Sequence, residues 1–311
     1  MGDSTPFNPN SPFTRAIADL FTWNLAIAAA IFLLVTSLVI YIAIRYRARP
    51  GQPEPPQIFG QRTLEVIWTL APALLLTGVS VATFNTMRAA DPPVEEVQQQ
   101  PDLIVTGLQW WWRVEYPQSG VVTANEIHIP IGTRLLMRID SEDVVHDFWV
   151  PQLSPKRDLV PGHTNYLWIQ ADTPGTYPGA CSEYCGAEHA WMFLRVIAQP
   201  QAEFDAWQQQ QQQPAAAPQG EAAQGAQVFQ RLTCMNCHAI AGTAANARIG
   251  PDLTHVGSRQ TLGAGRVENR PDTMARWITN PHELKPGVLM PGFQLSEADL
   301  HALVAYLETL K

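Results

Sequence analysis

Charge is missing from two long stretches of this 311-residue sequence. No Asp, Glu, Lys or Arg occurs from Leu25 to Ile44 or from Val66 to Phe84. Each stretch has about 20 residues, which as a helix crosses roughly 30 Å of lipid hydrocarbon. Buried helices of a soluble protein are the alternative, but two such runs in tandem at one end of the chain favour membrane spans.

The N-terminus lacks the basic segment and the small-residue cleavage site of a signal peptide, so no signal peptide is evident. The short connection between the two apolar runs contains Arg45, Arg47, Arg49 and Arg62. The positive-inside rule places this connection in the cytoplasm and both termini on the outer side. We therefore expect a transmembrane hairpin over residues 1–90, with everything after Arg88 on the periplasmic or extracellular side.

Cysteine is scarce: the chain has four, in two close pairs. The first pair is Cys181 and Cys185, followed closely by His189 and Met192, with a further imidazole upstream at His146. Sulfur and imidazole are the ligands that select copper over harder ions, and two such cysteines can both bridge a pair of metals. A zinc knuckle or a disulfide is the alternative. Zinc sites do not use a thioether, and a disulfide needs neither the histidine nor the methionine.

The second pair belongs to the sequence Cys234-Met-Asn-Cys237-His238, which is typical of covalent haem c attachment. Redox dithiols share the Cys-x-x-Cys spacing but lie in a βαβ pattern, whereas a helical stretch precedes this motif and further helices follow it. His238 would be one axial ligand of the iron. With both pairs assigned to cofactors, no cysteine is left for a disulfide.

The C-terminal segment resembles a class I cytochrome c, an all-α fold that we expect over residues 221–311. A Ser-x-x-Asp cap at Ser296 opens a terminal helix with one apolar stripe. The family's second axial ligand is a methionine on a late loop, and Met290, in Leu-Met-Pro-Gly-Phe, fits that place. His-Met ligation raises the potential of the haem. Met235 is too close to the attachment cysteines and Met274 lies in an expected helix, while His255 and His282 are assigned surface roles.

Residues 91–207 read as short strands between Gly, Pro and Asp breaks, which indicates a β-sandwich. The segment from Asp91 to Asp205 has sixteen acidic and six basic residues. This acidic surface either steers a cationic partner or only keeps the domain soluble. Residues 208–220 are rich in Gln, Pro and Ala, a composition that predicts a flexible linker of roughly 20 Å.

His146 and the Cys-x-x-x-Cys-x-x-x-His-x-x-Met run resemble the binuclear copper A site of cytochrome c oxidase subunit II. The resemblance implies a cupredoxin fold whose metal loop joins the last two strands. It also implies that Cys181 and Cys185 bridge both coppers. The remaining ligands it implies are His146 and His189, one on each copper, with Met192 and the backbone carbonyl of Glu183 as weak axial ligands.

Three further roles follow from this resemblance. Trp110 would receive electrons at the surface near copper A, although core packing also explains tryptophans in the run Trp110–Trp112, expected on alternating faces of a strand. The side chain of Glu183 would reach a magnesium or manganese site at the boundary with subunit I. Glu65 would lie at the mouth of a proton channel into subunit I, the alternative being an exposed interfacial carboxylate.

Together, the two resemblances imply subunit II of a proton-pumping caa-type oxidase, expected in a bacterial plasma membrane. Electrons would pass from its own haem c to copper A, and then to the haem–copper centre of subunit I, where dioxygen is reduced. The expected partners are subunit I, subunit III, membrane lipid and a soluble cytochrome or respiratory complex as donor, but no nucleic acid. The rival prediction is a membrane-anchored carrier that feeds a different reductase. The two-helix hairpin, Glu65 and Glu183 argue against it, because the roles expected for them require subunit I as a partner.

Overall fold

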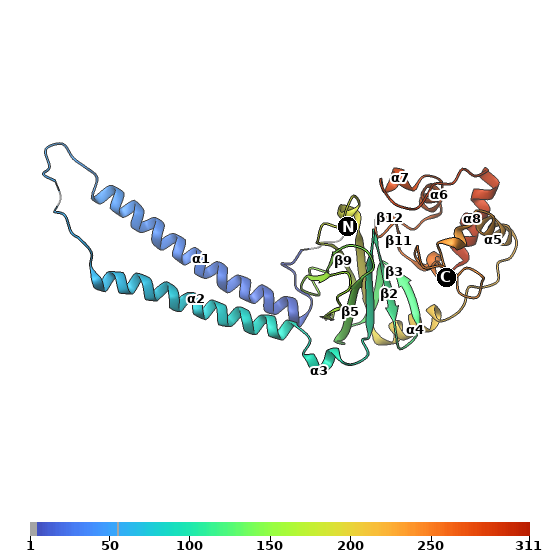
Figure 1. Cartoon of the computed structure of the whole chain (residues 1–311), viewed down its shortest axis with the longest axis horizontal. Helices are drawn as coiled ribbons and strands as arrows, with labels where there is room; N and C mark the ends of the chain where they lie inside the picture. The colour runs from blue at the N-terminus through green and yellow to red at the C-terminus, as the bar shows by residue number, and fades with distance from the viewer. Residues whose placement is uncertain (1–4, 55) are drawn as a thin grey trace. The chain divides into compact units, whose positions relative to one another are not determined.

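The computed structural model describes residues 5–54 and 56–311, which form two compact units (Figure 1). The first unit, residues 15–90, contains most of two apolar helices, α1 (Pro12–Arg45) and α2 (Arg62–Ala90). Both helices are long and apolar enough to cross a membrane, and their apolar side chains are exposed. Because every backbone group inside a helix is paired internally, such helices are stable in lipid. The two predicted spans are confirmed as helices.

The second unit, residues up to 14 together with 91–311, contains a sandwich of two five-stranded sheets. The strand order is β3-β2-β1-β5-β8 in one sheet and β4-β10-β9-β6-β7 in the other. The strands of the first sheet are β1 (Leu103–Leu108), β2 (Trp111–Tyr116), β3 (Val121–Ala124), β5 (Leu135–Ser141) and β8 (Asn165–Ile169). Those of the second are β4 (Glu126–Pro130), β6 (His146–Trp149), β7 (Arg157–Leu159), β9 (Gly175–Cys181) and β10 (Phe193–Gln199). The predicted cupredoxin-like sandwich is confirmed.

The core of the sandwich lies between the inner faces of these sheets. Along β10 the buried residues Leu194, Val196 and Ala198 alternate with half-buried ones, the period of two that a strand imposes. The same apolar core extends to Cys181, Cys185 and Met192. The candidate metal ligands are therefore held against a packed core.

The polyglutamine segment differs from its predicted conformation. Helix α4 (Gln201–Gln211) includes the first four glutamines of the run, so the coil prediction for residues 208–220 was wrong at its start. Phe204 is buried in the sandwich core, and the Trp207 indole stacks on the His128 imidazole of β4 with ring centroids 4.1 Å apart. Glutamine is a good helix former, so this aromatic anchor extends the helix into the run.

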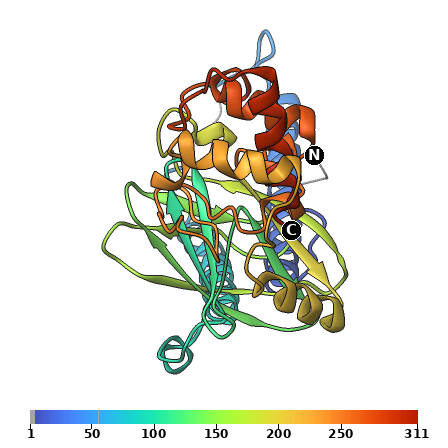
Figure 2. The same ribbon diagram turned by 90° about the vertical axis from the view of Figure 1, so that its right-hand side faces the viewer.

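The C-terminal part of the second unit is a small helical domain, shown in orange to red in Figure 2. It contains α5 (Glu221–Arg231), α6 (Pro271–Thr279), α7 (Pro281–Leu284) and α8 (Glu297–Thr309). Helices α5 and α8 pack closely because Gly225 has no side chain; a Cβ there would lie 1.9 Å from the carbonyl oxygen of Ala302. The expected Ser296 cap is present, since its hydroxyl accepts the Asp299 N–H at 3.1 Å. The predicted all-α domain is confirmed.

Candidate metal centres

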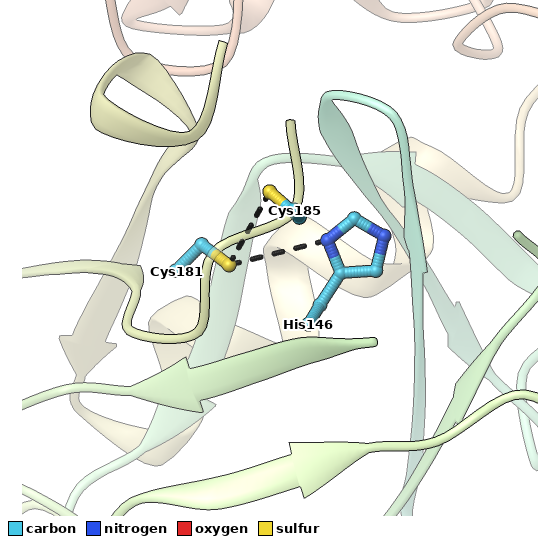
Figure 3. A group of neighbouring side chains, drawn as sticks. All are labelled: His146, Cys181 and Cys185. Atoms are coloured by element: carbon cyan, nitrogen blue, oxygen red, sulfur yellow. Dashed lines mark hydrogen bonds between the residues drawn. The ribbon is translucent and has the colours of Figure 1, made fainter. Parts of the chain in front are cut away.

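Three buried ligand groups meet at one end of the sandwich. His146 opens strand β6, Cys181 ends strand β9, and Cys185 lies on the loop that joins β9 to β10. Figure 3 shows the His146 ring and both thiols pointing toward one another. Their ligand atoms all lie within 4.8 Å of one another, with 3.8 Å between the two sulfurs and 3.9 Å from Cys181 Sγ to His146 Nδ1. The structure thus brings together residues 35 positions apart.

The other ligands expected from the sequence lie on the same loop. His189 begins the short 3₁₀ turn η1 (His189–Trp191), and its Nδ1 is 3.7 Å from Cys185 Sγ. Met192 is buried with its Sδ 3.9 Å from the same sulfur. The backbone carbonyl oxygen of Glu183 is 3.2 Å from Cys181 Sγ. All six predicted copper ligands are therefore adjacent, each presenting the atom that the prediction requires.

The orientation of His146 is fixed by two neighbours that sequence reasoning did not identify. Asp143 Oδ1 lies 2.8 Å from His146 Nε2, which leaves Nδ1 to face the cysteines. On β1, Gly107 makes room for the ring, because a Cβ there would lie 2.8 Å from His146 Cδ2. Carboxylate partners of this kind orient metal-binding imidazoles. The spacing of Asp143 three residues before His146 was a usable signal, whereas the approach of Gly107 is visible only in the fold.

The two thiols behave as a coupled acid pair. A hydrogen bond from Cys185 lowers the pKa of Cys181, despite the opposing effect of burial, and His146 lowers it further. The pKa of Cys185 is raised, first by this hydrogen bond and then by burial. A pair of this kind holds one thiolate readily, and metal binding then displaces the second proton. The donor set of two thiols, two imidazoles and a thioether fits copper better than zinc.

Trp110 lies against the metal loop but outside the strand where the sequence placed it. Strand β2 begins at Trp111, so the expected alternation of three tryptophans along a strand was wrong. The Trp110 indole Nε1–H donates to the carbonyl of Cys185 at 2.9 Å, and the Gln109 side chain donates to the same oxygen at 2.8 Å. These bonds hold the half-buried indole directly on the loop that carries the ligands.

The second candidate centre is the Cys-x-x-Cys-His segment of the helical domain. Cys234 begins the 3₁₀ turn η2 (Cys234–Asn236), Cys237 follows this turn directly, and His238 comes next. His238 Nδ1 donates to the carbonyl of Pro251 at 2.8 Å, so its Nε2 is left free for a metal. Burial lowers the pKa of His238, which favours the neutral imidazole that can ligate iron. The segment therefore fits haem attachment, and Pro251 is a partner that the sequence analysis missed.

The positions of the remaining candidate residues do not by themselves establish the roles expected for them. Met290 is half-buried in the irregular segment between α7 and α8, while Met274 belongs to helix α6 and is buried in the core. Glu65 lies in the first turn of α2, where Oε1 accepts the Gln61 N–H at 3.3 Å. The side chain of Glu183 is exposed, and its Oε1 accepts the Tyr184 N–H. The roles of Met290, Glu65 and the Glu183 carboxylate stay predictions.

Comparison with known families matches all three parts of the chain. Residues 7–86 match the transmembrane domain of cytochrome c oxidase subunit II, and residues 119–199 match its periplasmic domain. Residues 222–311 match the cytochrome c family.

Individual relatives extend over the same regions. Cytochrome c oxidase subunit 2 of Alkalihalophilus pseudofirmus is 38% identical over 99% of this chain and 91% of its own length. Quinol oxidase subunit 2 of Bacillus cereus is 32% identical over 67% of this chain and 73% of its own length. Among solved structures, the periplasmic domain of subunit II from Bradyrhizobium japonicum has 28% identity and a TM-score of 0.33. It covers 36% of this chain and 94% of that one.

Proposed function

Because this chain belongs to the cytochrome c oxidase subunit II family and carries a cytochrome c domain, we propose that it is the electron-accepting subunit of a caa-type terminal oxidase. The observation that carries this proposal is the gathering of His146, Cys181 and Cys185, with His189 and Met192 beside them. Quinol-oxidising relatives would not need these thiols.

The copper loop would hold a binuclear copper A centre. The residues that would hold the copper pair are Cys181, Cys185, His146 and His189, with Met192 and the backbone carbonyl of Glu183 as weaker ligands. When bound, the copper pair supplies one-electron transfer with little change in its surroundings. The chain's own part is to orient His146 through Asp143, to exclude water with the apolar core, and to lower the pKa of Cys181 so that one thiolate is held before the metal binds.

The helical domain would bind haem c through Cys234 and Cys237, and His238 and Met290 would be the residues that hold its iron. The carbonyl of Pro251 fixes the imidazole by accepting a hydrogen bond from the Nδ1–H, which keeps the second nitrogen available. A methionine ligand raises the potential of a haem. When bound, haem c would supply one-electron transfer toward the copper loop, where Trp110 would lie near the point of electron entry, and the copper loop would in turn serve subunit I.

The remaining roles concern the partner subunits. Subunit I would contain the haem–copper centre where dioxygen is reduced and protons are pumped, and subunit III and an external cytochrome or respiratory complex would complete the assembly. Glu183 would reach a magnesium or manganese ion at the subunit I boundary, and Glu65 would stand at a proton entrance. The two spans anchor the chain in the plasma membrane, and we place both redox domains on the periplasmic side because of the basic connection between the spans.

The test is Cys185→Ser in the membrane-extracted oxidase. The substitution removes one bridging thiolate, so the near-infrared absorbance of copper A should disappear and oxygen consumption should stop, while haem c is still reduced by ascorbate. Ala190→Ser, an exposed change on the same loop, is the matched control and should keep both centres. Metal analysis of the wild type should give two coppers in this chain for each haem c iron. Oxygen consumption that survives Cys185→Ser would refute the copper relay.

A further inference from the structure

The haem domain contacts the copper loop through two of its own loops. The carbonyl of Ala264 accepts the N–H of Phe193, the first residue after the ligand Met192, at 3.1 Å. The Arg266 guanidinium lies over the Trp191 ring, 4.7 Å from its centroid. Gly265 faces Phe193 so closely that a Cβ there would lie 2.9 Å from the Phe193 Cβ. Close backbone contact therefore exists between the two domains beside the candidate copper ligands.

Lys285 crosses this boundary from the haem domain. It follows helix α7 directly, and although it is a lysine it is only 2% exposed. Its Nζ donates to the carbonyl of Trp110 in the copper domain at 2.9 Å and to the carbonyl of Gly263 in its own domain at 3.3 Å. A lysine is rarely this buried, and its burial is costly unless its donors find such partners. The side chain thus joins two backbones that belong to different domains.

Glu188 completes the surroundings of this lysine. It is 1% exposed, and within the described chain neither of its carboxylate oxygens has a hydrogen-bond partner. Burial raises the pKa of this carboxyl, and the positive charges of Lys285 and Arg266 oppose the rise. A buried carboxylate of this kind needs nearby positive charge, so it favours the approach of the haem-domain loop that carries Lys285.

Trp110 is hydrogen-bonded both to Lys285 and to the loop that carries the candidate copper ligands. Its carbonyl accepts from Lys285, and its indole donates to the carbonyl of Cys185, a candidate copper ligand. A hydrogen-bonded connection between the two domains therefore runs from Lys285 through Trp110 to the metal loop.

We propose that Lys285 is a positioning residue for electron transfer between the two redox domains. Its two hydrogen bonds hold the backbone of Trp110 and the haem-domain loop at Gly263 in a fixed position relative to each other. This inference rests on the proposed function. The step itself moves one electron: the haem iron is oxidised by one electron and the copper pair is reduced by one, with no bond formed or broken. Lys285 touches neither centre; it acts through the backbone of Trp110.

The experiment uses the full chain in its oxidase complex, with Lys285→Met and the matched control Lys311→Met. Lys311 is an exposed lysine at the end of the same domain, so its loss changes the charge equally. The first measurement is the rate at which photoreduced haem c reduces copper A. We expect Lys285→Met to slow it by at least about tenfold, since small errors in position have large effects on rate. Lys311→Met should leave it unchanged.

The second measurement is independent of electron transfer. Amide hydrogen exchange at Phe193, whose N–H is bonded across the boundary, should accelerate in Lys285→Met alone. The copper A absorbance and the methionine–iron band of the haem should stay as in the wild type. Lys285→Arg, which keeps donors and charge at this position, should recover most of the rate.

The outcomes are distinguishable. If the wild type shows no electron transfer from haem c to copper A, the proposed function fails. If the wild type transfers electrons and Lys285→Met does so within twofold, with Phe193 exchange unchanged, the assignment of Lys285 fails. Equal slowing in Lys285→Met and Lys285→Arg would also overturn it, because the donor would then not matter.

Discussion

The direction in which His146 points decides whether a metal can be shared between the two thiols. Its ring has two nitrogens, and only Nδ1 faces Cys181, because Asp143 occupies Nε2 and the backbone of Gly107 approaches the ring. Neither neighbour touches the thiols. The candidate ligand set therefore depends on residues that contribute no metal bond themselves.

Asp143→Ala tests this orientation. The substitution removes the partner of Nε2, so the imidazole gains rotational freedom and the affinity for copper should fall by about 10–100-fold. Copper retention against increasing concentrations of a chelator, with the haem content as internal reference, measures the change. Asp205→Ala, an exposed change on helix α4, is the control. Equal copper retention in Asp143→Ala and the wild type would show that the ring is held by packing alone.

Helix α4 is the element that links the sandwich to the helical domain, and aromatic contacts hold it. The Trp207 indole packs on His128 and on Tyr116, whose hydroxyl donates to the His128 carbonyl. At its other end, the carbonyl oxygen of Gln211 lies 3.0 Å from Nε2 of His255 in the helical domain. This histidine is buried, so the surface role expected for it was wrong. Because α4 is packed against the sandwich, the free connection between the two domains begins only after Gln211.

The His128 contact makes the stability of this element depend on pH. Burial lowers the pKa of His128 to about 4, so the folded protein keeps this ring neutral. Between pH 6.5 and 4 the unfolded chain therefore binds a proton that the folded chain does not. Stability is fully present above pH 6.5 and falls as pH drops toward 4. The loss between pH 7 and pH 5 should be about 2 kcal/mol.

His128→Phe keeps a flat ring against Trp207 but cannot take up a proton. The difference in unfolding free energy between pH 7 and pH 5, measured by denaturant titration, should therefore be smaller in this variant than in the wild type by that amount. His163→Phe, an exposed histidine of the same domain, serves as the control. An identical pH profile in His128→Phe and the wild type would contradict the assignment.

At the scale of the whole molecule, the haem domain is bound to the sandwich as well as tethered to it. Glu126 on β4 is buried and accepts three hydrogen bonds from the helical domain, from the N–H groups of Gln260 and Thr261 and from the Thr261 hydroxyl, at 2.8–3.0 Å. Arg195 of β10 donates to the Gln260 side chain at 3.2 Å. These contacts lie apart from Lys285 and define a second attachment point.

Glu126→Ala should loosen this attachment. The change leaves the two buried donors of Thr261 and the part-buried Gln260 N–H without an acceptor, and each buried unsatisfied group costs about 1–3 kcal/mol. Limited proteolysis after Gln211 followed by size-exclusion chromatography measures the effect. The wild-type fragments should stay associated, whereas those of Glu126→Ala should separate. Glu203→Ala removes an exposed carboxylate and should behave as the wild type does. Association that survives Glu126→Ala would assign the attachment to Lys285 and the Phe193 contact instead.

The sequence by itself determined the domains of this protein and its candidate ligands. The length of the apolar runs predicted α1 and α2, and the alternation of apolar and polar residues predicted strands such as β5 and β10. The two cysteine motifs indicated both candidate centres. All of these signals depend on residues that are close together in the chain. The structure corrected the start of β2 and the extent of the glutamine linker. Both errors arose where a side chain's environment, here the metal loop or His128, overrides local composition.

Only the tertiary structure decided how the centres are held and connected. Gly107 packing on His146, Glu126 receiving the haem domain and Lys285 reaching Trp110 each join residues from 39 to 175 positions apart. No local pattern marks such residues, because a glycine, a strand glutamate and a loop lysine look ordinary in sequence. Their roles arise from burial, which makes an unpartnered charge or an extra carbon atom costly and so fixes which distant groups must meet.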